Sequence, residues 1–219
     1  MHMEHTHTLQ EWQQLIKNQS DLIVQASSMD CDDEWRSWPI GMSWQYVHNF
    51  QKGERLQIGT HSNLVFNAIS WGTDKRRRPT GVNRRSILAT LAANGIPNQM
   101  IHHSQYFDTL PSYKFIISPE GNGIDCHRHY EAFMAGCVPI LERNPLIEEK
   151  YKGCPILWTS DYSEITPEYL EKKYTEMIDE LYDFSRLFLS FYDEETQTKI
   201  KESGNFWLKR IDATRCTWY

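Results

Sequence analysis

One stretch of the sequence decides the fold: residues 114–141 are KFIISPEGNGIDCHRHYEAFMAGCVPIL. Residues 114–117 and 138–141 are short apolar runs, and each predicts a buried strand. Between them the pattern predicts a loop with two glycines and then a helix over 125–135, which Gly136 ends. Strand, loop, helix and strand in this order indicate one unit of an alternating α/β chain.

The same alternation extends in both directions from this stretch. Upstream, a strand is predicted over 64–69, and Asn83 is placed to cap a helix that runs to about residue 94. Downstream, a strand over 156–158 precedes a helix that opens at Thr166 and continues to about residue 181. Weaker patterns predict the remaining elements: a helix over 9–18, strands over 21–26 and 100–102, and a last helix over 193–210. The whole pattern predicts an α/β fold, a Rossmann-like parallel sheet with helices on both faces.

Composition excludes several classes of protein. The 219 residues include 8 Trp, 11 Tyr and 9 Phe, which argues against disorder. The chain has 23 basic and 29 acidic side chains and a net charge of −6, so we expect no nucleic-acid partner. No apolar run approaches the roughly 20 residues of a membrane span, and no leader sequence is visible. Five widely spaced cysteines without a Cys-x-x-Cys pair indicate free thiols in a reducing compartment, so we expect a cytoplasmic protein.

The loop and helix start after residue 117 have the chemistry of an anion site. In parallel sheets, ligands bind at the carboxyl ends of the strands. Gly121 and Gly123 allow the backbone to approach a ligand closely, and the free N–H groups at a helix start favour a phosphate. Arg128 can add a bidentate phosphate contact, and Glu131, on the same helix face, can accept hydrogen bonds from ribose hydroxyls. Together these residues indicate a nucleoside diphosphate site; the alternative is an ordinary strand–turn–helix junction with solvated charges.

Residues 121–140 resemble the donor-binding lobe of exostosin-type and related GT-B glycosyltransferases. Those families share the core Arg-x-x-Glu-Ala-Leu-x-x-Gly-Cys-x-Pro; here Arg128 begins that core and Phe133 replaces its leucine. The resemblance extends over about residues 62–180. It implies that Arg128 binds the diphosphate of a nucleotide sugar and that Glu131 binds its ribose. It also implies a pocket that is shaped by the preceding loop, Gly121, Asn122, Gly123, Ile124 and Asp125.

Further charged residues flank this motif. Glu120 could face the donor sugar or the acceptor, or it could be a surface carboxylate. Residues 74–85 form a basic loop in an acidic chain, at the predicted start of a helix. Arg84 and Arg85 are the candidates there to stabilise a departing nucleoside diphosphate. The alternative for this loop is a solvated basic surface.

The resemblance also bears on mechanism. Many retaining enzymes of this fold have Glu-x7-Glu, but here Gly123 occupies the position of the first glutamate, which favours inversion. An inverting enzyme needs a base beside the acceptor hydroxyl, and in GT-B enzymes that base usually comes from the N-terminal lobe. Asp32 and Asp33, in an acidic cluster after the strand predicted over 21–26, are our candidates. A solvated acidic loop is the alternative for this cluster.

The other reactive side chains indicate no cofactor. His127 and His129 are two residues apart on the predicted helix and do not share a face, so we expect no metal site. Cys126 could be reactive if the helix start lowers the pKa of its thiol, or it could simply be packed. We expect arginines, and not a metal ion, to neutralise the diphosphate.

The resemblance implies two domains of unequal size. Residues 1–60 would form a reduced N-terminal, acceptor-side lobe, and 61–219 a Rossmann-like nucleotide-sugar-binding lobe whose last helix could cross back. The first lobe could be pared down, the acceptor lobe could be lost, or a homodimer could complete the cleft. We expect an inverting, metal-independent glycosyltransferase that moves sugar from a UDP-sugar to a glycan hydroxyl in a viral or bacterial setting. The alternatives are a non-catalytic nucleotide- or glycan-binding module and a phosphate-binding enzyme of another doubly wound family.

Overall fold

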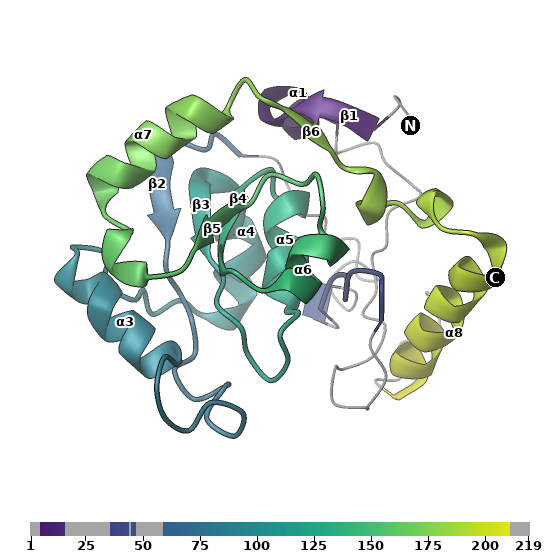
Figure 1. Ribbon diagram of the computed structural model, residues 1–219, viewed down its shortest axis with the longest axis horizontal. Helices are drawn as coiled ribbons and strands as arrows, with labels where there is room; N and C mark the ends of the chain where they lie inside the picture. The colour runs from purple at the N-terminus through teal and green to yellow at the C-terminus, as the bar shows by residue number, and fades with distance from the viewer. Residues whose placement is uncertain (1–4, 16–35, 44, 47–58, 211–219) are drawn as a thin grey trace.

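A computed structural model describes residues 5–15, 36–43, 45–46 and 59–210, and the fold is α/β. Four parallel strands form the central sheet in the order of their sequence (Figure 1). They are β2 (Asn63–Phe66), β3 (Tyr113–Ile117), β4 (Val138–Glu142) and β5 (Leu157–Thr159). The register pairs Val65 with Phe115 and Ile117 with Ile140. A parallel sheet whose strands alternate with helices is Rossmann-like, which confirms the coarse prediction.

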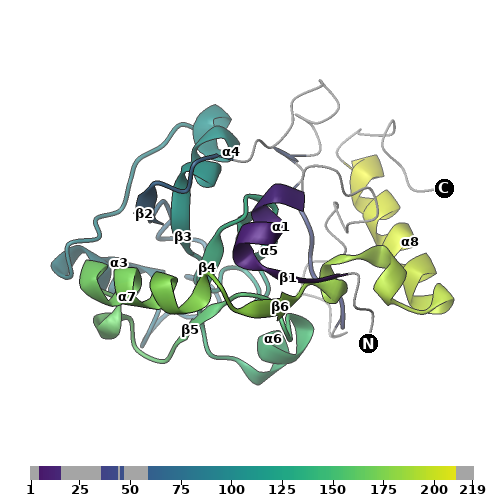
Figure 2. The same cartoon turned by 90° about the horizontal axis from the view of Figure 1, so that it is seen from above.

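Helices cover both faces of this sheet, as predicted. The strand period of two points Phe115 and Ile117 to one face and Ile116 to the other. Phe115 and Ile117 pack in one core cluster with residues of α3 (Arg84–Ala93) and α7 (Pro167–Met177). Ile116 packs in a second cluster with α5 (His127–Met134), α4 (Tyr106–Thr109) and α6 (Pro145–Lys150). Figures 1 and 2 show the sheet between these two groups of helices.

Local signals explain where the helices begin and end. The Asn83 side chain accepts hydrogen bonds from the backbone N–H groups of Arg85 and Ser86, and the Ser86 hydroxyl accepts one from the Asn83 N–H. This capping box confirms the predicted start of α3. The Thr166 side chain caps α7 more simply, by accepting a hydrogen bond from the Tyr169 N–H. Gly136 ends α5 at a φ of 71°, a left-handed conformation that glycine adopts without strain.

One predicted strand is not formed, and two predicted helices differ from the structure at their ends. Residues 100–102 form no strand; Met100 is 95% exposed, so its apolar side chain marks no buried position. The helix predicted to residue 181 ends at Met177, and the chain then forms β6 (Leu181–Asp183). β6 pairs antiparallel with β1 (Thr6–Thr8), and that pairing requires an extended backbone. The helix over 125–135 begins at His127, and α6 was not predicted.

The first described residues pack against the sheet-bearing lobe. Trp12, in α1 (Leu9–Leu15), donates a hydrogen bond from Nε1 to the carbonyl of Phe133 at 2.9 Å. Gln13 donates from Nε2 to the carbonyl of Gly136 at 2.7 Å. These two hydrogen bonds join α1 to the end of α5. The predicted strand over 21–26 lies outside the described residues.

The last helix, α8 (Glu194–Arg210), is continuous through Gly204. It lies on the side of the molecule away from α3 (Figures 1 and 2), and Ile200 is buried in the same cluster as α5. No helix within the described ranges is both long enough and apolar enough to cross a membrane.

Candidate functional site

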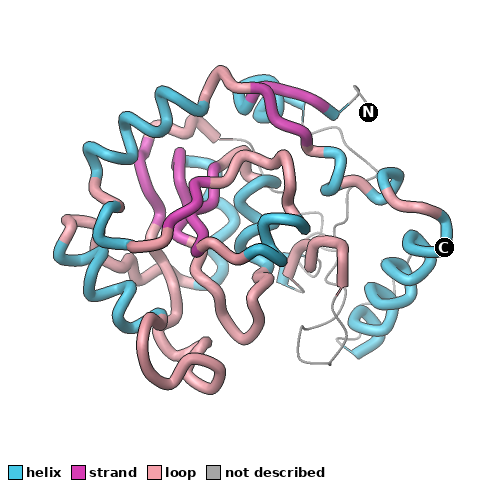
Figure 3. The backbone as a smooth tube through the Cα atoms, in the orientation of Figure 1, coloured by secondary structure: helices cyan, strands magenta, loops and turns pink. Residues whose placement is uncertain are grey.

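A cavity of about 320 Å³ opens at the carboxyl edge of the sheet, where the loops after β2 and β3 meet. Figure 3 shows these loops in pink beside the magenta strands. Four parts of the chain contribute to its walls: Ile40, Ser43 and Gln45; Thr73 and Arg84; Tyr106; and Gly121, Asn122, Gly123, Asp125, Cys126, His127, Arg128 and Glu131. The structure therefore brings most of the predicted binding residues to one cavity.

The glycine loop lies tightly against its neighbours. The Gly121 N–H donates to the carbonyl of Gly123 at 2.9 Å. A Cβ on Gly121 would lie 2.9 Å from Nη2 of Arg84 and 3.2 Å from Sγ of Cys126. A side chain at residue 121 would therefore have to displace the end of the Arg84 side chain. Asn122, in contrast, is exposed at the rim.

Arg128 and Glu131 lie in the same wall of the cavity, joined by a tyrosine. Arg128 donates from Nη1 to the carbonyl of Ala68 at 2.7 Å, and its guanidinium carbon lies 5.3 Å from the centroid of the Tyr106 ring. The Tyr106 hydroxyl donates to Glu131 at 3.1 Å, and the backbone N–H of Ser43 donates to the same carboxylate at 3.3 Å. Glu131 is 4% exposed. Burial raises the pKa of Tyr106 well above its ordinary value, so this side chain remains a neutral donor.

Arg84 lies at the cavity wall, but much of its guanidinium is used by the protein. It donates from Nε to the carbonyl of Glu120 at 2.8 Å, from Nη2 to that of Pro119 at 2.9 Å and from Nη1 to that of Ser70 at 3.3 Å. The pKa of Arg84 is lowered, mainly by burial and also by the nearby positive charge of Arg128. Arg84 thus braces the glycine loop and adds positive charge to the cavity.

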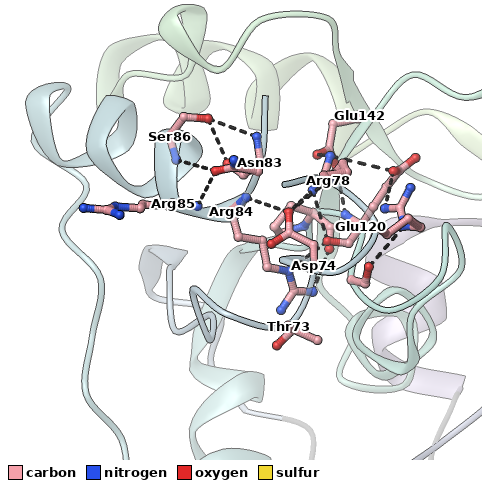
Figure 4. A network of polar contacts seen from close by, with 12 residues as sticks. Thr73, Asp74, Arg78, Asn83, Arg84, Arg85, Ser86, Glu120 and Glu142 are labelled. Carbon is pink, nitrogen blue, oxygen red and sulfur yellow. Dashed lines mark hydrogen bonds and ion pairs between the residues drawn. The ribbon is translucent and has the colours of Figure 1, made fainter. Parts of the chain in front are cut away.

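Arg85 does not line the cavity. It is exposed and points away from Arg84 (Figure 4). The reason is helical geometry, because consecutive residues on a helix point about 100° apart. The structure therefore separates the two arginines that the sequence prediction grouped together.

Glu120 belongs to an ion-pair network beside the cavity. Arg77 donates to it at 2.6 Å, and the Asn144 side chain donates to its other oxygen at 3.1 Å. Arg78 bridges Asp74 at 3.0 Å and Glu142 at 2.8 Å (Figure 4). Two arginines of the basic loop predicted as a second phosphate site, Arg77 and Arg78, are thus paired with three carboxylates. Sequence reasoning missed the pairs with Glu120 and Glu142 because these two residues are distant from the loop in the chain.

Two other residues of the predicted pocket have structural partners. Asp125 accepts hydrogen bonds from Lys150 and Tyr151, each at 2.8 Å, and from the backbone N–H of Ile40 at 3.0 Å. It is buried, and it ties the segment at residues 36–43 to the floor of the cavity. Ile124 does not line this cavity; it packs against the core beneath the loop.

The two histidines of the motif have different surroundings. Nδ1 of His127 lies 2.9 Å from the carbonyl of Gly41, and the ring lines the cavity. His129 is buried, with Nδ1 2.7 Å from the Ser118 hydroxyl and Nε2 3.3 Å from the carbonyl of Ile124. Burial lowers the pKa of His129. In the described parts of the chain, no group of three or more His, Cys, Asp or Glu side chains could hold a metal ion.

Cys126 is packed and not activated. Its Sγ lies 3.8 Å from the carbonyls of Pro119 and Gly123. Burial raises the pKa of this thiol to about 12, so it is protonated at neutral pH. Because the thiolate is the reactive form of cysteine, the second of the two alternatives, a packed Cys126, fits the structure.

Asp32 and Asp33, the predicted bases, lie outside the described residues. Tyr106 was not predicted, because it lies in the short helical turns of residues 103–112, which have no clear hydrophobic period. No protein-family model matches the chain, and no curated protein is significantly similar to it.

Proposed function

We propose that this protein is a GT-B-type glycosyltransferase that transfers a sugar from a nucleoside diphosphate sugar to a glycan hydroxyl. A UDP-sugar is the first choice of donor, on the resemblance to exostosin-type enzymes. The observation that supports the proposal is that Arg128 and Glu131 line one cavity and both contact Tyr106, Arg128 over its ring and Glu131 at its hydroxyl. One cation and one fixed carboxylate at a helix start match the diphosphate and the ribose of a nucleotide.

The diphosphate would lie at the start of α5. The N-cap residue, Cys126, makes no side-chain capping hydrogen bond, so no capping side chain occupies the N–H groups of the first turn. Such N–H groups and the helix dipole favour an anion. Arg128 uses Nη1 for the Ala68 carbonyl; its other N–H groups donate to no residue of the described ranges and can contact phosphate oxygens. Arg84 adds a second positive charge to the cavity wall.

The ribose would lie at Glu131. A carboxylate has about four acceptor positions, and the Tyr106 hydroxyl and the Ser43 N–H fill two of them. The remaining positions can accept from the two ribose hydroxyls. Because Glu131 is nearly buried and held from both sides, its carboxylate is oriented before the nucleotide binds.

The proposed reaction is inverting and uses arginines, not a metal ion, to stabilise the departing nucleoside diphosphate. Asp32 and Asp33 remain candidates for the base that accepts the acceptor proton. A homodimer could complete an acceptor site beside this cavity.

One observation favours a second candidate, a non-catalytic nucleotide-binding module. Both carboxylates in the described cavity lining have partners in the protein: Asp125 is ion-paired with Lys150, and Glu131 accepts hydrogen bonds from Tyr106 and Ser43. A binding module would bind nucleotide without releasing sugar from it. Incubation with UDP-sugars and GDP-sugars, followed by assay of released UDP or GDP, distinguishes the two candidates.

The proposal is tested by calorimetric titration of UDP, GDP and their sugar conjugates into wild type and Arg128→Ala. Losing hydrogen bonds to a charged group costs roughly 1.5–3 kcal/mol, which is about a tenfold to hundredfold loss of affinity. Arg143→Ala is the matched control, since Arg143 is exposed, lies outside the cavity lining and, among the described residues, pairs with Glu148. If folded wild-type protein binds no nucleotide, the proposed function is wrong.

A further inference from the structure

The cavity wall contains an imidazole, His127, that the sequence interpretation considered only as a metal ligand. We propose that His127 is the general base that takes the proton from the acceptor hydroxyl, a role that rests on the proposed sugar transfer. In this proposal His127 takes the role that the sequence interpretation gave to Asp32 and Asp33. Its position, unlike theirs, is described by the structure.

The hydrogen bond to Gly41 fixes which ring nitrogen can act. A carbonyl oxygen only accepts, so Nδ1 of His127 must donate across the 2.9 Å that separates it from the Gly41 carbonyl. In the neutral ring, Nε2 then has the lone pair. Nε2 makes no hydrogen bond to any residue of the described ranges, and the ring lines the cavity. The protein therefore holds this imidazole in the tautomer that a base requires.

His127 and the arginines lie against different parts of the chain. Arg128 is anchored to Ala68, after β2, and Arg84 to Ser70, Pro119 and Glu120. His127 is anchored to Gly41, in the segment at residues 36–43. Because His127 and Arg128 are consecutive on α5, their side chains point about 100° apart. An inverting transfer needs this separation, since the base must lie away from the leaving diphosphate.

The other ionisable groups of the described lining are less suited to this role. Glu131 accepts hydrogen bonds from Tyr106 and Ser43, and Asp125 is buried in an ion pair with Lys150. Tyr106 and Cys126 are neutral near pH 7, because burial raises the pKa of each. Arg84 and Arg128 are cations and have no lone pair to offer.

The proposed step conserves atoms and charge. Nε2 of His127 takes the proton of the acceptor hydroxyl while that oxygen forms a bond to the anomeric carbon of the donor. The bond between the anomeric carbon and the phosphate oxygen breaks, and its electron pair leaves with the nucleoside diphosphate. The imidazolium then gives its proton to solvent.

The test compares kcat with nucleotide affinity in matched variants of the full chain. His127→Asn keeps a donor near the Nδ1 position for the Gly41 carbonyl and removes Nε2. His102→Asn is the control, because His102 is exposed and lies outside the cavity lining. The probes are UDP-glucose, UDP-N-acetylglucosamine and GDP-mannose with simple glycosides as acceptors; release of UDP or GDP gives the rate, and calorimetry gives the affinity.

We expect kcat of His127→Asn to fall by about 100-fold to 10,000-fold, with nucleotide affinity within about threefold of wild type. Added imidazole should restore part of the rate to His127→Ala, which a merely structural role would not permit. The inference is overturned if kcat is unchanged, if affinity falls in parallel with kcat, or if Asp32→Asn or Asp33→Asn abolishes transfer while His127→Asn retains it. In those cases wild-type transfer still supports the proposed function. If wild type binds no nucleotide, both proposals fail.

Discussion

Two helices begin at the carboxyl edge of the sheet with an arginine in the first turn, and their starts differ. The start of α3 is closed by its own neighbours: Asn83 forms a capping box with Ser86, and Asp74 accepts the Arg84 N–H at 2.8 Å. The start of α5 has no capping side chain, and Arg128 lines a cavity. Whether an arginine at a helix start can bind an anion therefore depends on which groups around it are already satisfied.

A buried aspartate organises each of the two starts. The Asp74 carboxylate accepts hydrogen bonds from the backbone N–H of Arg84, at the start of α3, and from the guanidinium of Arg78. The Asp125 carboxylate accepts hydrogen bonds from Lys150, Tyr151 and the Ile40 N–H. All three donors lie outside α5, so they fix the loop before α5 without occupying the helix start. Asp74 thus neutralises cations at the α3 start, whereas Asp125 fixes the floor of the cavity and leaves the α5 start open.

The largest expected effect comes from breaking the anchor of the α5 start. In Lys150→Met, the buried Asp125 carboxylate loses its cation, and we expect the free energy of unfolding to fall by about 3–5 kcal/mol. Urea denaturation measures this loss. The control is Lys173→Met, which breaks the exposed pair with Glu176 and should cost under about 1 kcal/mol. Equal losses in the two variants would show that Asp125 does not depend on Lys150.

The second prediction compares Arg84 and Arg128, which we expect to differ in their effects on stability and on nucleotide affinity. Arg84→Met removes a donor from the carbonyls of Glu120, Pro119 and Ser70. The Glu120 carbonyl keeps Arg78 as a donor at 3.2 Å and Ser70 is exposed, so the main cost is the unsatisfied carbonyl of the buried Pro119, roughly 1–3 kcal/mol. We expect the free energy of unfolding, measured in urea, to fall by about that amount. Arg128→Met should cost less than Arg84→Met in stability and more in nucleotide affinity. The reverse order would contradict the assignment of Arg84 as a brace and Arg128 as a ligand.

Sequence patterns predicted the elements whose signals are local. The cap at Asn83, the end of α5 at Gly136 and the strand–loop–helix–strand order around residue 121 all depend on neighbours in the chain. β6 could not be predicted in this way, because its extended form depends on β1, far away in the sequence. Residues 100–102 show the opposite error, because the apolar side chain of Met100 is 95% exposed.

The sequence indicated which residues of the motif would line a site better than it indicated how they contact one another. The motif put Arg128 and Glu131 on one helix face, because residues three apart are neighbours on a helix, and both residues line the cavity. It could not show that Tyr106 joins them, or that the segment at residues 36–43 contributes Gly41 and Ser43. It also grouped Arg84 with Arg85, since the carbonyls that hold Arg84 belong to distant loops.

The smallest effect tests whether the closed start of α3 is separate from the site. Asn83→Ala removes the cap and should lower the free energy of unfolding by about 1 kcal/mol, while Asn83→Gly should cost only a few tenths. Nucleotide affinity should stay within about threefold of wild type in both, because Asn83 does not line the cavity. Denaturation and calorimetry on the same samples measure the two quantities. If affinity falls with stability across this pair, the start of α3 contributes to the site, and the contrast between the two helix starts is wrong.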